Sequence, residues 1–251
     1  MCHELIAEPA VFGPGRTAAT GATLMLDAPD GASSRAFLAR PEIASGVGVV
    51  VLPDNRGLHP FYEKIATYLA EQGHVAIAID WYGRTAGTGP RSDRFPFMEH
   101  LMQVRRETID ADIDAATERL RGGEGATAVF ALGFCFGGRQ AFFASAPSMG
   151  LAGTVGFYGG PGIYPNGALG PTQRATELKA PILAFFGGAD EGIPRSDVEA
   201  FDEALDEAGV EHEIVTYGGA PHGFFDMHLE EYKEASADAW NRTLRFLDRT
   251  M

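Results

Sequence analysis

The stretch Ala128-Val-Phe-Ala-Leu-Gly-Phe-Cys-Phe-Gly-Gly138 decides the expected fold of this chain. It combines a short apolar strand, a turn bracketed by glycines and the start of a helix. Its centre, Gly133-Phe134-Cys135-Phe136-Gly137, matches the G-x-S-x-G nucleophile elbow with cysteine in place of serine. Such a sharp turn crowds the neighbouring backbone, so small residues are needed two positions before and after the nucleophile. The pattern predicts Cys135 as a nucleophile and the Phe136 amide, at the helix N-terminus, as an oxyanion donor.

A lone cysteine is more often a small buried hydrophobic residue than a nucleophile. Here the preceding strand, the two glycines and the following helix all fall where an elbow needs them. The combination favours the catalytic interpretation of Cys135.

Composition excludes several other classes of function. The chain has 251 residues, of which 45% are hydrophobic and 22% charged, and its formal net charge is −14. This charge disfavours nucleic acid and anionic membranes as partners. Cys2 and Cys135 are the two cysteines, and we expect no disulfide, no metal site and a reducing cytoplasmic location. No signal peptide and no membrane-spanning run are expected, and no cofactor is implied.

Strands alternate with helices from residue 47 to the end of the chain. We expect strands at 47–53, 74–80, 128–133, 154–157, 181–186 and 213–217, and helices at 61–71, 98–121, 195–208 and 229–249, with a long loop over 81–96. The two short runs at 23–27 and 33–40 predict a hairpin. This order predicts an α/β fold with a mostly parallel central sheet and helices on both faces. We expect a single domain over 1–251, with residues 1–20 as an N-terminal arm.

A base and an orienting acid should follow the nucleophile along the chain. Asp190 comes just after the strand at 181–186, and His222 lies in the loop after the strand at 213–217. Parallel strands bring their carboxyl ends to one edge of a sheet, so both loops can converge on Cys135. Alone, a loop aspartate more often caps a turn, and a lone histidine is usually structural. Together, in this order, they predict a Cys135–His222–Asp190 triad.

The chain resembles the dienelactone hydrolase (carboxymethylenebutenolidase) family of the α/β-hydrolase superfamily over roughly residues 20–250. The resemblance depends on four motifs: G-F-C-F-G-G at 133–138, F-F-G-G-A-D at 185–190, P-H-G-F at 221–224 and D-W-Y-G-R at 80–84. It implies a Cys-His-Asp triad that hydrolyses an ester or lactone through an acyl-enzyme.

The resemblance also implies roles for residues outside the triad. Asp54 stands where the family has a carboxylate, usually glutamate, that contacts the resting thiol, and the Asn55 amide matches the second oxyanion donor. Arg84 matches an arginine that holds the substrate carboxylate. Asp226 stands where the best-known members have a second such arginine. A carboxylate there would repel a carboxylate substrate, so we expect neutral esters or lactones to be preferred.

We therefore expect a hydrolase that cleaves a small ester or lactone, acting as a monomer or weak dimer. Its pocket should be partly apolar, with a lining that includes Trp81, Tyr82, Phe136, Tyr158 and Phe224. Two alternatives stay open: a general small-molecule carboxylesterase or thioesterase, and a non-catalytic protein that uses Cys135 as a redox sensor. Activity measured on a panel of lactones and p-nitrophenyl esters distinguishes the first alternative from a lactone hydrolase. Peroxide sensitivity without ester turnover would identify the second.

Overall fold

The structure is a computed structural model that describes residues 9–92, 95–164, 167–226 and 228–250. Its strands follow the order β1-β2-β4-β3-β5-β6-β7-β8. Strand β2 pairs antiparallel with β1 and β4, whereas the β3–β4, β6–β7 and β7–β8 pairs are parallel. The predicted α/β fold with a mostly parallel sheet is confirmed. The described residues divide into two compact units, one mainly over 13–130 and one over 131–249 together with residues 9–12.

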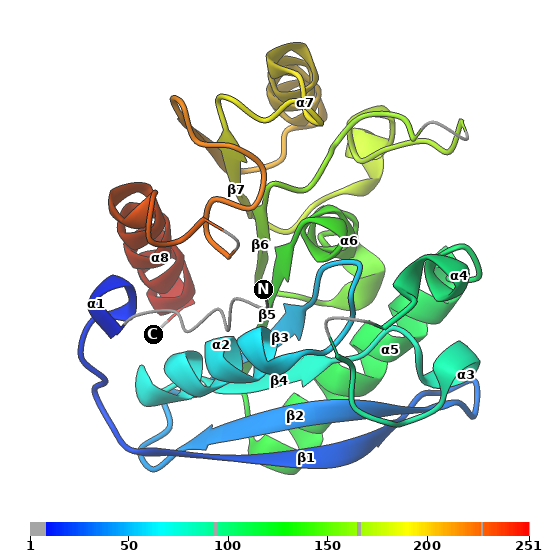
Figure 1. Cartoon of the computed structure of the whole chain (residues 1–251), viewed down its shortest axis with the longest axis vertical. Coiled ribbons are helices and arrows are strands. Elements are labelled where there is room, and N and C mark those ends of the chain that lie inside the picture. Colours follow the sequence, from blue (N-terminus) through cyan, green and yellow to red (C-terminus); the bar gives the residue numbers. More distant parts are fainter. Residues whose placement is uncertain (1–8, 93–94, 165–166, 227, 251) are drawn as a thin grey trace. The chain divides into compact units, whose positions relative to one another are not determined.

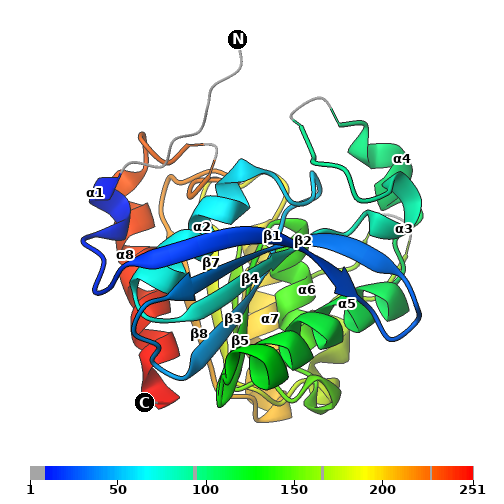
Figure 2. The ribbon, with the colours of Figure 1, turned by 90° about the horizontal axis from the view of Figure 1, so that it is seen from below.

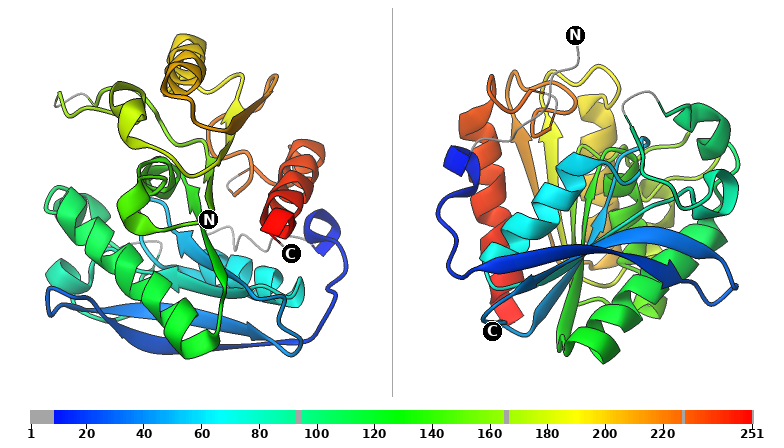
Figure 3. Two further views of the ribbon diagram at one scale, coloured as in Figure 1. Left: turned by 180° about the vertical axis from the view of Figure 1, so that it is seen from behind. Right: turned by 60° about the horizontal axis from the view of Figure 1, so that its bottom comes forward.

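The first unit begins with a hairpin and continues into parallel strands. Its strands are β1 (Ala19–Asp27), β2 (Ser33–Pro41), β3 (Val47–Leu52) and β4 (Val75–Ile79), and its helices are α2 (Pro60–Glu71), α3 (Gly83–Ala86), α4 (Phe97–Leu101) and α5 (Arg106–Glu118), followed by a π-helical turn, η1 (Arg119–Gly123). Figures 2 and 3 show α2 and α5 on opposite sides of these strands. Every residue of β3 and β4 is buried, as expected for strands covered on both faces.

One helix expected in this unit is interrupted. Instead of a single helix over 98–121, α4 ends at Leu101 and α5 starts at Arg106. The Thr108 hydroxyl accepts the Arg105 N–H and donates to the Arg105 carbonyl, so it caps a new helix start that the apolar spacing alone did not reveal. The expected loop over 81–96 likewise contains the short helix α3.

The second unit contains the predicted nucleophile. Its elements are α1 (Pro9–Phe12), α6 (Phe136–Ala144), η2 (Pro147–Met149), β6 (Gly153–Phe157), η3 (Thr172–Glu177), β7 (Ile182–Gly187), α7 (Arg195–Ala208), β8 (His212–Tyr217) and α8 (Lys233–Leu247), followed by the short turn η4 (Asp248–Thr250). Strand β5 (Ala128–Phe134) includes residues of both units. In Figure 1, α6 and α8 lie on opposite sides of β6. Helix α7 turns Val198, Phe201 and Leu205 inward, the spacing of one helical face.

The N-terminal segment is more ordered than an arm, in the part that is described. Phe12 in α1 packs edge-on against Trp240 of α8, with ring centroids 4.9 Å apart, and β1 already begins at Ala19. The Phe12 side chain therefore anchors the segment. Residues 1–8 of the expected arm, including Cys2, lie outside the described residues. The single hydrolase domain over 1–251 stays a prediction.

Candidate active site

The nucleophile elbow has the geometry that its glycines predict. Cys135 lies between β5 and α6 with φ 52° and ψ −111°, a backbone conformation that L-residues rarely adopt. Its N–H donates to the Phe157 carbonyl at 2.9 Å. A Cβ at Gly133 would lie 2.0 Å from the Gly137 carbonyl oxygen, so only glycine fits there. Phe136 opens α6, which places its amide at the positive end of the helix.

Asp190 and His222 form the predicted acid–histidine pair. His222 Nδ1 lies 2.7 Å from Asp190 Oδ2. The other carboxylate oxygen, Oδ1, accepts the N–H groups of Gly192 at 2.8 Å and Ile193 at 3.2 Å. Both oxygens of a nearly buried carboxylate are thus occupied, and the imidazole is held with Nδ1 toward the acid. Nε2 is the ring nitrogen left to exchange a proton with the nucleophile.

The charge state of His222 ties this pair to Cys135. Burial opposes protonation, but hydrogen bonds and charge interactions with Asp190 and Cys135 outweigh it and raise the pKa of His222 to about 10. At neutral pH the ring is then an imidazolium beside the cysteine. A neighbouring imidazolium favours the anionic, nucleophilic form of a thiol. Cys135, His222 and Asp190 all belong to the second unit, and their action as a triad stays a prediction.

Tyr158 packs against His222 and is itself hydrogen-bonded to Asp226. The Tyr158 ring meets the His222 ring edge-on, with centroids 5.0 Å apart. Its hydroxyl donates to Asp226 Oδ1 at 3.0 Å, and both residues are buried. Asp226 therefore takes part in an internal hydrogen bond, whereas the sequence led us to expect it as a repulsive group in the substrate pocket. Phe224, with no exposed surface, packs edge-on against Tyr158.

Trp81 and Tyr82 support the turn at residues 53–55 of the first unit. Trp81 Nε1 donates to the carbonyls of Pro53 at 3.2 Å and Asp54 at 3.1 Å, and the Tyr82 hydroxyl donates to the Asn55 carbonyl at 2.5 Å. The C=O and N–H of a trans peptide point in opposite directions. The Asn55 amide, whose peptide carbonyl belongs to Asp54, is therefore directed away from Trp81. This fixed orientation suits the expected oxyanion donor, which stays a prediction.

Four of the five aromatic residues expected as pocket lining are buried. Trp81, Tyr82, Tyr158 and Phe224 are each at most 3% exposed. Their side chains support backbone or the histidine in this conformation. Direct contact with a substrate stays a prediction that their burial argues against.

Asp54 is paired within its own turn. Its carboxylate accepts the Arg56 backbone N–H at 2.8 Å and Arg56 Nε at 2.7 Å. Burial opposes ionisation, but contacts with His59 and Arg56 outweigh it and hold the pKa of Asp54 below its usual value. The residue is therefore a carboxylate at neutral pH. Its expected contact with the resting thiol stays a prediction.

The expected carboxylate clamp, Arg84, is engaged by protein carboxylates. Its Nη1 donates to both oxygens of Asp112 at 2.7–2.8 Å, while Nε and Nη2 donate to Asp30 at 3.0 Å. Arg91, from the same loop, donates to the buried Asp80. Arg94 lies outside the described residues. Charged partners that only the fold brings close explain why these arginines looked available in the sequence.

Sequence reasoning missed one charged residue beside the nucleophile. Arg139 lies one helical turn after Cys135 and is only 3% exposed. Its guanidinium contacts carbonyl groups of the segment after β6. An arginine within the apolar run Phe136–Ala144 was the available signal, because a charge there must find partners when the helix is buried.

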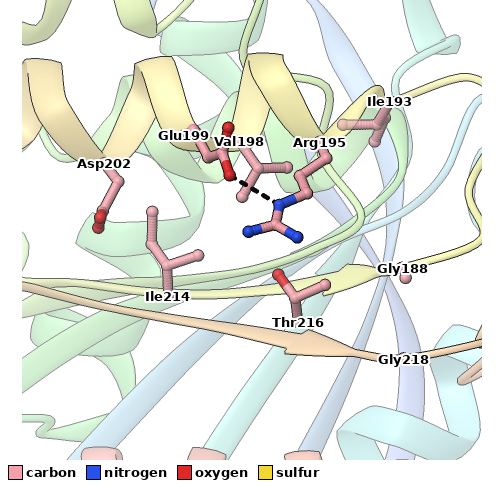
Figure 4. Close-up of a pocket in the computed structure, with 10 residues that line it drawn as sticks. Gly188, Ile193, Arg195, Val198, Glu199, Asp202, Ile214, Thr216 and Gly218 are labelled. Carbon is pink, nitrogen blue, oxygen red and sulfur yellow. Dashed lines mark hydrogen bonds and ion pairs between the residues drawn. The ribbon is translucent and has the colours of Figure 1, made fainter.

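A separate cavity of about 530 Å³ lies between α7 and the strands β7 and β8 (Figure 4). Ile193, Val198 and Ile214 supply apolar lining, and Arg195 pairs with Glu199 within it. No residue of the triad lines it, although Gly188 and Gly218 at its edge begin the loops that carry Asp190 and His222. It is therefore lined by residues other than Cys135, His222 and Asp190.

Two further searches concern only the residues that the structure describes. Within them, no three or more histidine, cysteine, aspartate or glutamate side chains are grouped so that they could hold a metal ion. Nor do they include a helix with the length and apolar character needed to cross a bilayer.

Known proteins resemble this chain along most of its length. The family model described as "Dienelactone hydrolase family" matches residues 34–251. A Salmonella typhimurium protein named "Putative carboxymethylenebutenolidase" is 33% identical, with 95% of each chain covered. A Bradyrhizobium protein named "Probable 2-oxo-3-(5-oxofuran-2-ylidene)propanoate lactonase" is 30% identical, over 87% of this chain and 90% of its own.

A solved structure supports the same assignment. The crystal structure of a Klebsiella pneumoniae protein, described as "Putative Dienelactone Hydrolase", superposes with a TM-score of 0.80 at 29% identity, covering 92% of this chain and 99% of the other. The match of the family model over most of the chain and the shared fold lead to one assignment. The chain therefore belongs to the dienelactone hydrolase family.

Proposed function

We propose that this protein hydrolyses small, activated esters or lactones through an acyl-enzyme on Cys135, with His222 and Asp190 completing the triad. The observation that carries the proposal is the 2.7 Å contact between Asp190 and His222, combined with the raised pKa of His222 beside the cysteine. A histidine held in one orientation by a buried carboxylate is the base that a cysteine nucleophile requires.

The reaction then follows in two halves. The Cys135 thiolate attacks the substrate carbonyl, and the oxyanion accepts a hydrogen bond from the Phe136 amide, with the Asn55 amide as the expected second donor. The His222 imidazolium protonates the leaving alkoxide or enolate, which leaves a thioester on Cys135. His222 next takes a proton from water, which attacks the thioester and releases the acid and the thiolate.

One feature favours neutral substrates, and another favours activated esters over amides. Arg84, the candidate for binding a substrate carboxylate, is paired with protein carboxylates, and so is Arg91 from the same loop. Thiolate is also a good leaving group, so amides would return to starting material more readily than activated esters. We expect higher kcat/KM for a neutral lactone or ester than for dienelactone, which carries a carboxylate. A clear preference for dienelactone would show that an arginine is released to bind it.

The decisive experiment follows the covalent intermediate. Wild-type protein mixed with p-nitrophenyl acetate should release a burst of nitrophenol and gain one acetyl group on Cys135, detected by intact-mass and peptide mass spectrometry. Cys135→Ala should lose both signals, whereas Cys2→Ser, a change of the chain's other cysteine, should keep them. Turnover retained in Cys135→Ala would rule out this mechanism. Peroxide-sensitive Cys135 without any ester turnover would support the redox-sensor alternative.

A further inference from the structure

A closed loop leaves β6 directly beside the start of α6. A Cβ at Gly159 would lie 2.4 Å from the Arg139 amide nitrogen, so the chain passes here in close contact with the elbow helix. Farther along, the Thr172 N–H donates to the Pro161 carbonyl at 3.1 Å, and a Cβ at Gly170 would lie 2.1 Å from the Gly162 oxygen. The described residues 161–164 and 167–172 thus approach each other where the segment begins and ends, as in compact surface loops. We call it the 161–172 loop.

Buried Arg139 fixes the first part of this loop. Its Nη1 donates to the carbonyls of Gly160 and Gly162, each at 2.6 Å, and Nη2 lies 3.4 Å from the Leu169 carbonyl. Its guanidinium carbon also lies 3.6 Å from the centre of the Tyr164 ring. A buried cation is costly unless it is well bonded. Here the offsetting contacts come from the loop, so the position of Tyr164 depends on Arg139.

The loop presents apolar side chains to solvent. Ile163 is 56% exposed, Leu169 55% and Tyr164 36%. Three large apolar residues exposed on one short loop form a surface that water solvates poorly and a ligand can cover. One face of the Tyr164 ring is occupied by Arg139, and the exposed remainder is available for a flat group to stack against or meet edge-on.

The same tyrosine is linked to the nucleophile through Arg139, which lies one helical turn after Cys135 and contacts the Tyr164 ring. Burial raises the pKa of Tyr164, the Arg139 cation opposes this shift, and a charge on Cys135 adds to it. The route of the chain agrees, because the Cys135 amide bonds Phe157 at the end of β6, shortly before the loop begins.

We propose that Tyr164, together with Ile163 and Leu169, forms the wall that receives the acyl group of the substrate and selects flat, apolar acyl groups, with Arg139 as its positioning residue. The inference rests on the proposed function, because an acyl group bonded to Cys135 must occupy the space beside the thiol. Substrates with an aromatic or conjugated acyl group gain the contact with the Tyr164 ring, and acetyl groups are too short to use it fully.

Alkylation of Cys135 tests the wall without any ester turnover. Iodoacetamide and its N-phenyl derivative each form a carbon–sulfur bond and release iodide, but only the second carries an aromatic ring. The measured quantity is the ratio of their rate constants at Cys135, followed by intact-mass spectrometry. We expect Tyr164→Ala to lower the ratio of aromatic to small reagent about two- to tenfold, the size of one aromatic contact, and Tyr164→Phe to retain it.

Arg139→Lys and Arg139→Gln test the positioning role. Each keeps a hydrogen-bond donor but loses the planar fork that bonds two carbonyls and the ring. Whichever of them folds with a cooperative thermal transition should lower the ratio as Tyr164→Ala does. The matched control is Arg174→Lys, because Arg174 also lies over an aromatic ring, that of Phe143 at 5.5 Å, but pairs with exposed Glu177. The control should leave the ratio unchanged.

An unchanged ratio in Tyr164→Ala would overturn the wall, and an unchanged ratio in both folded Arg139 variants would overturn the positioning role. These outcomes are independent of hydrolysis. If the wild type shows the expected ratios but cleaves no ester, the proposed function fails and the wall stands. If the wild type does cleave esters, but the ratio of its activity on p-nitrophenyl benzoate to that on p-nitrophenyl acetate is the same in Tyr164→Ala, the proposed function stands and the acyl selectivity fails.

Discussion

Replacing Asp190 with asparagine tests how His222 is oriented. In the wild type, Oδ1 accepts the Gly192 and Ile193 N–H groups while Oδ2 faces His222 Nδ1. An asparagine amide that keeps its oxygen on the two N–H groups must turn its NH₂ toward Nδ1. Nδ1 then has to be the unprotonated nitrogen, so the neutral ring carries its proton on Nε2. That tautomer cannot accept a proton from the nucleophile.

The size of the effect follows from the alternative orientation. Flipping the amide restores the productive tautomer but sets its NH₂ against the Gly192 and Ile193 N–H groups. Losing those two hydrogen bonds, one of them buried, costs roughly 2–4 kcal/mol. The productive arrangement is then populated about 30- to 1000-fold less. The loss of the carboxylate charge also makes the protonated form of His222 less stable. We expect Asp190→Asn to lower kcat/KM about 10³-fold, and His222→Ala, which removes the base itself, to lower it further.

The assay measures kcat/KM for p-nitrophenyl acetate beside the alkylation rate of Cys135, and both should fall. Asp202→Asn is the matched control, because Asp202 also pairs with a histidine, His212 Nε2 at 3.0 Å, but is exposed on α7. It should stay within about twofold of wild type, as surface pairs contribute little. An Asp190→Asn variant within tenfold of wild type would refute the argument and leave another group to orient the base.

Three further outcomes are expected. Tyr158→Phe removes the hydroxyl that donates to buried Asp226, and urea unfolding should show a loss of about 1–2 kcal/mol; no loss would mean that this hydrogen bond is dispensable. Arg84→Met leaves the buried Asp112 carboxylate without the Nη1 group that donates to both of its oxygens, and it should cost about 3 kcal/mol of unfolding free energy, against under about 0.5 for the exposed Arg195→Met; equal losses would contradict a structural role for Arg84. Burial outweighs the contact with Arg84 and raises the pKa of Asp112 to about 6. The folded protein therefore binds this proton more tightly than the unfolded chain. The resulting stabilisation is fully present below pH 3.8 and is lost as pH rises through about 6. The unfolding free energy of wild type relative to Asp112→Asn should therefore fall by about 2–3 kcal/mol between pH 4 and pH 7, and a difference that rises instead would reverse the sign of the shift.

Local patterns in the sequence were sufficient to predict the sheet and the pairing of Asp190 with His222, while the triad itself stays a prediction. Alternation of apolar strands with helices indicated a mostly parallel sheet, because only strands buried on both faces carry continuous apolar runs such as Val47–Leu52. The elbow was recognisable because its tight turn requires glycine at neighbouring positions such as Gly133, where a Cβ would clash with the backbone. Asp190 and His222 were found because the position of a loop after a parallel strand fixes the sheet edge where it lies.

Charge pairing and side-chain direction were decided by the tertiary structure alone. From the sequence we expected Arg84 to be available for a substrate carboxylate. In the structure its N–H groups donate to Asp30 and Asp112, which are 54 and 28 residues away along the chain. From the sequence we expected Asp226 to place a negative charge in the substrate pocket. In the structure it accepts a hydrogen bond from Tyr158, 68 residues away along the chain. Arg139 follows the nucleophile by four positions, but its partners arrive with the loop after β6. Such contacts depend on which distant backbone groups reach a buried side chain, and spacing within one segment carries no information about them.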